Sequence, residues 1–153
     1  MQPQSQAPAI PHSHKLLITY KVSGELVRAE GIDLILIVKN MGDVAFTGGR
    51  FSSIRLEFSA VTSSVSESDL QEIPVLEPQA EAESTYRLFL PVDGFGWVVA
   101  QVKADDGQPV EHYQNQSFAT GQEWRNSIYV ERREERHIIS LLEKIATLLE
   151  RSQ

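Results

Sequence analysis

The sequence predicts a mainly β protein: an antiparallel, two-sheet β-sandwich of about seven short strands, followed by one C-terminal amphipathic α-helix. Two observations favour this fold class. Between residues 15 and 121, apolar residues alternate with polar ones in short runs that turn residues separate. From about residue 128 to residue 151, the apolar spacing changes to that of one helix face. We therefore expect a flexible tail over residues 1–14, a sandwich over 15–121 and a helix over 122–153.

Five segments carry the clearest strand pattern, namely residues 15–22, 32–39, 53–61, 84–90 and 97–104. A weaker strand is expected to include Ser117 and Phe118. Short strands within SGELVRAEG and TSSVSESDLQE would complete the set. No helical period is visible before residue 122, which is typical of an all-β sandwich rather than a parallel sheet with crossover helices.

Composition and charge exclude several classes of protein. The chain has 153 residues, enough for a core that needs no additional covalent links, and it contains no cysteine. Disulfides, thiol nucleophiles and cysteine-bound zinc are therefore excluded. The net charge of −7 argues against nucleic acid as a partner. No apolar run is long enough for a membrane span, and residues 1–15 lack the apolar segment of a signal peptide.

The stretch GIDLILIVKNMGDVAFTGGRF ends a strongly apolar strand in a loop that is rich in glycine. Such a loop is a catalytic loop, a phosphate cradle or the corner of a sheet. Asn40 and Gly42 tolerate the positive φ that a sharp strand exit requires. No helix pattern and no Lys-Ser/Thr pair follow Gly48 and Gly49, as a phosphate cradle would need. The stretch therefore predicts a sandwich corner.

Three longer motifs, VKNMGDVAFTG, IPVLEPQAEAESTYRLFL and GFGWVVAQVKADDGQPVEHYQNQS, resemble the bacterial cell-adhesion-related, immunoglobulin-like domains called CARDB-like. The matching positions are Asn40, Gly42, Leu76, Pro78, Gly96, Trp97 and Val99. Gln79 stands where the family usually has glycine. The resemblance covers about residues 15–120 and implies a seven-stranded, immunoglobulin-like sandwich used for adhesion, spacing or protein contact. It implies neither catalytic residues nor a cofactor, and it favours an extracellular or periplasmic location.

Apolar residues also stand at positions that should point away from the core. They are Leu17, Ile35, Ile37 and Phe89. In an immunoglobulin-like strand order, the three strands that carry them are neighbours in one sheet. We therefore expect a contiguous apolar patch that another surface covers.

The expected helix carries an apolar stripe, formed by Ile138, Leu141, Leu142, Ile145, Leu148 and Leu149. Burying such side chains contributes roughly 1.5–3 kcal/mol each, so we expect the stripe to pack on something. The chain's own helix, a second subunit or a different protein could cover the patch. The hypothesis is an oligomer, built helix on helix or helix on a neighbouring sheet, in a non-catalytic interaction module.

Other residue clusters suggest weaker alternatives. Asp105, Asp106 and Glu111 are oxygen ligands that could hold calcium, although Asp105-Asp106-Gly107 also suits a hairpin tip. His112 beside Glu111 is the only lead for a hydrolytic or metal site. His12 and His14 have the spacing of a weak chelate but fall in the expected tail, and His137 borders the helix stripe.

Aromatic and basic clusters complete the candidates. Trp124, Tyr113 and Tyr129 are the aromatic residues that could form a carbohydrate-binding surface, or could pack the helix on the sandwich. The basic residues Arg125, Arg132, Arg133 and Arg136 alternate with Glu131, Glu134 and Glu135. Because the acidic residues cancel most of the positive field, we interpret this segment as a solvated face.

Overall fold

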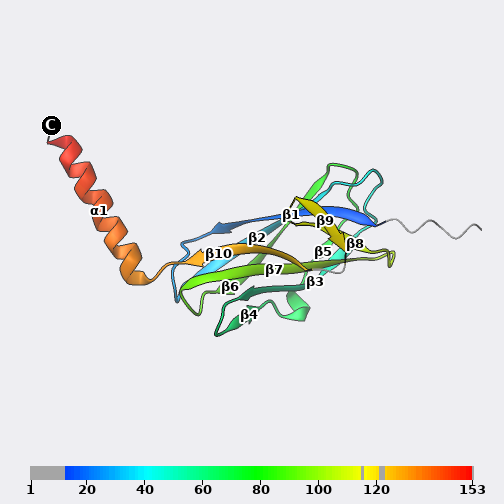
Figure 1. Cartoon of the computed structure of the whole chain (residues 1–153), viewed down its shortest axis with the longest axis horizontal. Helices are drawn as coiled ribbons and strands as arrows, with labels where there is room; N and C mark the ends of the chain where they lie inside the picture. Colours follow the sequence, from blue (N-terminus) through cyan, green and yellow to red (C-terminus); the bar gives the residue numbers. More distant parts are fainter. Residues whose placement is uncertain (1–12, 115, 121–122, 153) are drawn as a thin grey trace, which may run out of the picture.

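The computed structural model describes residues 13–114, 116–120 and 123–152. Within these ranges the chain forms a sandwich of two β-sheets, from one end of which a single helix projects (Figure 1). The prediction of a mainly β, two-sheet sandwich with one C-terminal helix is confirmed, and the strand count is ten rather than seven.

The strands are β1 His14–Ser23, β2 Gly31–Asn40, β3 Gly49–Glu57, β4 Thr62–Ser64, β5 Glu72–Ile73, β6 Glu81–Phe89, β7 Gly94–Ala104, β8 Val110–Gln114, β9 Ser117–Thr120 and β10 Trp124–Val130. The helices are the 3-10 turn η1 Glu67–Asp69 and the α-helix α1 Arg133–Arg151. Sheet I has the strand order β6-β2-β1-β8-β9. Sheet II has the order β10-β7-β3-β4, and β5 pairs with β3. Among these strands the pairing is antiparallel except between β1 and β8, which run parallel.

The sequence pattern did not predict the strands β8 and β10, because polar residues interrupt the alternation of apolar residues in both. His112 is buried in β8 alongside Val110, and it interrupts the apolar alternation. In β10, Trp124 and Ile128 are buried, whereas Asn126 between them is exposed at the sheet edge. Residues 124–130 therefore belong to sheet II and not to the helix.

The structure places both boundaries of the sandwich at other residues than the sequence predicted. The helix begins at Arg133, whereas the sequence pattern placed it from residue 122. At the other boundary, the first strand begins at His14, which the prediction assigned to the tail. His14 is buried and makes an edge-to-face contact with Phe46, with ring centroids 5.1 Å apart.

One continuous core lies between the two sheets. Leu34 and Leu36 project into it from sheet I, and Ile54, Leu56 and Val98 project into it from sheet II. These are the positions that strand alternation predicts to be inward. Because each strand contributes every second residue to this core, the remaining residues form the two outer faces of the sandwich.

The loop after β2 is a sandwich corner, and the buried side chain of Asn40 holds it together. Its Nδ2 donates hydrogen bonds to the carbonyl oxygens of Val44 and Leu76, at 2.9 and 2.8 Å, and its Oδ1 accepts one from the backbone N–H of Gly42 at 2.9 Å. Both N–H groups and the oxygen of the side-chain amide thus have hydrogen-bond partners within the protein. Gln79, also hydrogen-bonded to Asn40 through the backbone, has a φ of 73°, which glycine adopts at lower cost.

The turn at Asp105-Asp106-Gly107 links the two sheets. It follows β7 in sheet II and leads to β8 in sheet I, so it is not the tip of a hairpin. Gly107 has a φ of 76°, a value that suits glycine.

The helix α1 is anchored to the sandwich only at its base. The backbone of Glu131 exchanges hydrogen bonds with Leu26 and Arg28, and Arg132 forms an ion pair with Asp93 at 3.6 Å. Beyond this joint, no strand in the described part of the chain packs along α1, which leaves the sandwich at the end opposite to the start of β1 (Figure 1).

Candidate interaction surface

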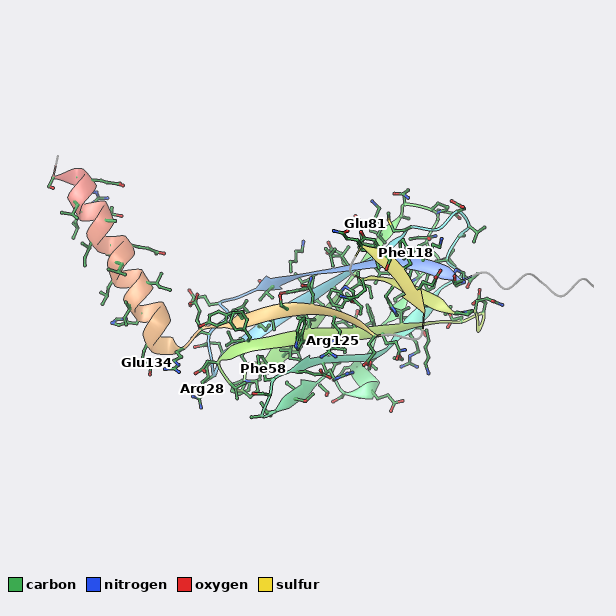
Figure 2. All side chains as sticks on the ribbon, in the orientation of Figure 1. Arg28, Phe58, Glu81, Phe118, Arg125 and Glu134 are labelled. Carbon is green, nitrogen blue, oxygen red and sulfur yellow. The ribbon has the colours of Figure 1, made fainter. Side chains whose placement is uncertain are left out.

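The helix stripe is exposed over its whole length. Its six side chains, Ile138, Leu141, Leu142, Ile145, Leu148 and Leu149, have exposed fractions between 44% and 63%. In Figure 2, side chains surround α1 on all sides without meeting the sandwich beyond the helix base. The possibility that the chain's own helix covers the patch on sheet I is therefore wrong for this arrangement of the chain. The stripe is instead available to another molecule.

The helix has little support of its own. Its N-cap residue, Arg132, makes no side-chain capping hydrogen bond to the first turn. Nucleation of a helix in water is costly, because the first turn fixes several residues for a single hydrogen bond. Packing of the apolar face is the usual source of helix stability in proteins, and in this chain no strand supplies it along α1.

The outer face of sheet I carries three of the four predicted patch residues side by side. Strands β6, β2 and β1 are neighbours, as expected. Ile35 and Ile37 lie on β2. Leu17 of β1 lies opposite Lys39 of β2 and is therefore the diagonal neighbour of Ile37. The side chains of all three are partly buried. Charged residues on the neighbouring strands can cover such side chains with their long aliphatic stems. Lys21 of β1 and Glu83 of β6 form an ion pair at 3.6 Å across the face of β2.

Phe89 is separated from the other three patch residues. It lies opposite Gly31, and the row formed by Asp33 and Arg87 stands between it and Ile35. Asp33 and Arg87 form an ion pair at 3.4 Å. The expectation of one contiguous patch is therefore wrong: the surface consists of a partly covered ridge and of a single exposed phenylalanine.

The outer face of sheet II is closed at its centre by a network of charges. Val99 points outward between Arg55 and Arg125, yet it is fully buried. Arg55 donates hydrogen bonds to both carboxylate oxygens of Glu123, at 2.6 and 2.8 Å, and one to Glu57 at 2.6 Å.

The same network shifts the ionisation of its members. The hydrogen bonds from Arg55 lower the pKa of Glu123 below its ordinary value, and they outweigh the effect of partial burial. The pKa of Arg55 is raised, first by its hydrogen bond with Glu123. Both groups are therefore charged at neutral pH and form a strong ion pair. Because Val99 lies between Arg55 and Arg125, this network covers its outward apolar side chain.

An aromatic pair that the sequence analysis did not single out lies at the helix end of sheet II. Phe95 and Tyr129 are paired in register, with ring centroids 4.8 Å apart, and 78% of Phe95 is exposed. Trp97 lies next to this aromatic pair and is partly covered by the guanidinium of Arg125, 5.3 Å from the ring centroid. The signal was available, since Phe95 and Trp97 occupy outward positions in the alternating run GFGW.

The three aromatic residues considered for carbohydrate binding do not gather on one surface. Trp124 is buried against Tyr20, Tyr113 contacts Phe118 at the other sheet, and Tyr129 belongs to the aromatic pair. The proposed cluster is therefore not formed.

The acidic residues considered for calcium are engaged separately. The carboxylate of Asp106 is hydrogen-bonded to Nε2 of His14 at 2.8 Å and accepts the backbone N–H of Gln108 at 2.9 Å, while Glu111 accepts a hydrogen bond from the hydroxyl of Ser13. Burial alone would raise the pKa of Asp106, but these hydrogen bonds, led by that with His14, lower it. Within the ranges described, no group of three His, Cys, Asp or Glu side chains is placed to hold a metal ion.

The remaining histidine and arginine candidates are also placed apart. His112 points into the sandwich, where its Nε2 accepts the backbone N–H of Val102 at 3.2 Å, whereas Glu111 points outward from the same strand. They cannot act as a dyad. His137 is exposed near the start of the stripe. The side chains of Arg133 and Arg136, like His12, lie outside the described residues. No helix in the described part of the chain has the length and apolarity to cross a membrane.

Comparison with known proteins finds matches among solved structures. No family model matches the sequence, and no curated protein matches it. The chain is similar to the crystal structure of a CARDB domain from Pyrococcus furiosus in complex with di-metal ions, with a TM-score of 0.48 and 12% identity over 78% of this chain and 89% of that chain. The solution structure of the same domain gives 0.45 and 16% over 78% and 96%. A β-glucosidase from Listeria innocua in complex with glucose gives 0.44 and 12% over 77% of this chain, but 16% of the enzyme. The domain type that the sequence motifs resemble is thus found among the structural matches.

Proposed function

We propose that this protein is a non-catalytic interaction module that self-associates through the stripe on α1. One observation carries the proposal: six aliphatic side chains remain 44–63% exposed on a helix that packs along no strand. Full burial of such side chains is worth roughly 1.5–3 kcal/mol each, so even partial burial against another molecule is strongly favourable.

Association also supplies what the helix lacks by itself. A helix of 19 residues without a side-chain cap at its N-terminus gains most of its stability from packing of its apolar face. Burial of the stripe and formation of the helix are therefore coupled, and the free energy of association includes the cost of ordering α1.

A second copy of α1 is the surface that best matches the stripe. Apart from the aromatic pair and Trp97, the outer faces of the sandwich expose few contiguous apolar side chains, since ion pairs extend over Ile35 and Val99. The ridge of Leu17, Ile35 and Ile37, and separately Phe89, remain as smaller contact surfaces for a second copy or for another protein. We assign them a secondary role.

Sedimentation of the full chain beside three variants tests the proposal. The first variant ends at Arg132, which removes α1 but keeps β10 in sheet II. The second carries Ile145→Asp within the stripe, and the third carries Ala146→Asp, at the neighbouring position off the stripe. We expect the full chain and the Ala146→Asp control to self-associate at concentrations in the micromolar range and above, and the other two variants to remain monomeric. A monomeric full chain at all concentrations, or association that survives loss of α1, contradicts the proposal.

A second candidate function is that of a spacer, which includes the adhesion role implied by the sequence motifs. It is favoured by one observation: β1 starts at one end of the sandwich and α1 leaves at the other (Figure 1). An extended chain of this kind separates whatever is attached to its two ends. Small-angle scattering of the full chain and of the form that ends at Arg132 tests this arrangement. A maximum dimension that does not fall when α1 is removed contradicts it, because α1 would then lie along the sandwich.

A further inference from the structure

We propose that two copies of the chain associate with their α1 helices parallel, so that both sandwiches lie at the same end of the helix pair. This inference rests on the helix-mediated self-association proposed above and adds the number of copies, their orientation and a second contact. The partner is thus a second copy of this chain.

The order of residues along the stripe favours a parallel pair. In a seven-residue repeat, abcdefg, Ile138 and Ile145 occupy position a, and Leu141 and Leu148 occupy position d. β-Branched residues at a, with leucine at d, favour two parallel strands in a coiled coil. The order of isoleucine and leucine along the stripe is therefore the one that favours a parallel dimer.

Charges beside the stripe favour the same orientation. His137, Lys144 and Arg151 occupy position g, whereas Leu142 and Leu149 occupy position e. In a parallel pair, position g of one helix faces position e of the other, so the aliphatic stem of Lys144 covers Leu149 of the second copy.

An antiparallel pair would place like charges together. In that arrangement position g faces position g, so Lys144 would lie opposite Lys144 of the second copy. Juxtaposed like charges disfavour a wrong arrangement by repulsion. The basic residues at g therefore act against the antiparallel pair and leave the parallel one unaffected.

The aromatic pair of Phe95 and Tyr129 gives the parallel arrangement an additional contact. Tyr129 lies at the end of β10, just before the joint at Glu131, and Phe95 is its neighbour in register. In a parallel pair the two helix bases are adjacent, so these rings meet the second sandwich. In an antiparallel pair they would be separated by about the helix length, 19 residues at roughly 1.5 Å each. A stripe of two heptads is short for a coiled coil, which makes this contact valuable.

The absence of cysteine from the chain permits a direct test with single-cysteine variants of the full chain. Glu134→Cys introduces a thiol at position d of the first turn, and Ser152→Cys introduces one at position a beyond the last turn. Glu143→Cys, at position f on the opposite side of the helix, is the matched control. Each variant is oxidised alone and in an equimolar mixture of Glu134→Cys with Ser152→Cys, at a concentration where sedimentation of the unaltered chain gives its mass.

Each outcome has a distinct meaning. The proposal predicts a dimer by sedimentation, disulfide-linked dimers of Glu134→Cys alone and of Ser152→Cys alone, and at least about tenfold less product from Glu143→Cys. A dimer that cross-links only in the mixture is antiparallel, which overturns this inference but leaves the proposed function intact. A larger assembly overturns the two-stranded arrangement. A monomeric unaltered chain overturns the proposed function and this inference together.

Discussion

The outward aliphatic side chains at the centre of each sheet are covered by other side chains of the same chain, whereas those of α1 are exposed. On the sandwich, Ile35 and Ile37 lie under the Lys21–Glu83 ion pair, and Val99 is fully buried under a network of four charged side chains. On α1, all six stripe residues remain exposed, although the helix also carries charged residues.

The difference follows from the geometry of the two elements. In a sheet, neighbouring strands place charged side chains about 5 Å on either side of an outward apolar residue, and their long stems can reach over it. In a lone helix, the charged residues lie beside or behind the stripe, and no second strand or helix brings a charged stem over it. An apolar residue on an outward sheet position can thus be covered within the chain, whereas a helix stripe needs a neighbouring element.

The largest effect should come from charges placed in the helix stripe. The double variant Leu141→Glu with Leu148→Glu introduces two carboxylates at position d, and we expect self-association to weaken by at least about 100-fold. The matched change on the sheet, Ile35→Thr with Ile37→Thr, should leave the dissociation constant within about twofold. Sedimentation equilibrium measures both. If the sheet variant weakens association as much as the helix variant, the two surfaces do not differ in the way described.

A second prediction concerns the sandwich, which should fold without help from a partner. Asn40→Ala removes three hydrogen bonds from a buried corner and leaves the carbonyl oxygens of Val44 and Leu76 without that donor. We expect the free energy of unfolding to fall by about 2–4 kcal/mol, while association through α1 is unchanged at temperatures where the protein is folded. Denaturant unfolding of the form that ends at Arg132 gives the first quantity. A loss below about 0.5 kcal/mol would be inconsistent with this role for Asn40.

A third, smaller effect concerns the charges over Val99. The pKa of Glu123 is lowered in the folded protein, so its stabilising effect is present above its pKa in the unfolded chain, and is lost as pH falls through the folded value. Glu123→Gln should therefore lower the free energy of unfolding at neutral pH by about 1 kcal/mol, since the pair is partly exposed. The difference from the unaltered protein should shrink in acid. A difference that is constant between neutral pH and pH of about 3 would contradict an ionic origin.

The smallest effect should come from the ion pair over β2. Lys21 and Glu83 are both more than half exposed, so a double-mutant cycle with Lys21→Ala and Glu83→Ala should give a coupling below about 0.5 kcal/mol. Their main contribution is the cover that their stems give to Ile35 and Ile37. Binding of a fluorescent hydrophobic dye should therefore increase in the double variant more than in Lys39→Ala. Equal dye binding by the two variants would contradict this covering role.

Much of the fold was predictable from the sequence because alternation reports directly on strands with two distinct faces. Residues 15–22, 32–39 and 97–104 carry an inward apolar residue at every second position, and each of them falls in a strand. The pattern fails where tertiary contacts satisfy a polar residue on an inward position. His112 is an example, since its buried ring accepts a hydrogen bond from the backbone of Val102.

The candidate surface was predictable in part for a related reason. The period of the apolar residues gave the six members of the helix stripe, and the strand order gave Leu17, Ile35 and Ile37 as neighbours on one sheet. The sequence could not show that Asp33 and Arg87 separate Phe89 from this ridge, because that depends on the register between β2 and β6. The pairing of Phe95 with Tyr129 depends on register in the same way.

Amide hydrogen exchange of the unaltered full chain, followed over a 100-fold dilution, tests most directly whether another copy covers the helix stripe. Because burial of the stripe stabilises α1, the amides of residues 138–149 should exchange slowly at the highest concentration and become at least about tenfold faster at the lowest. The amides of β2 serve as the internal control and should not change. Exchange in α1 that is rapid at every concentration, or equally slow at every concentration, would contradict the account, because the helix would then not depend on a second copy.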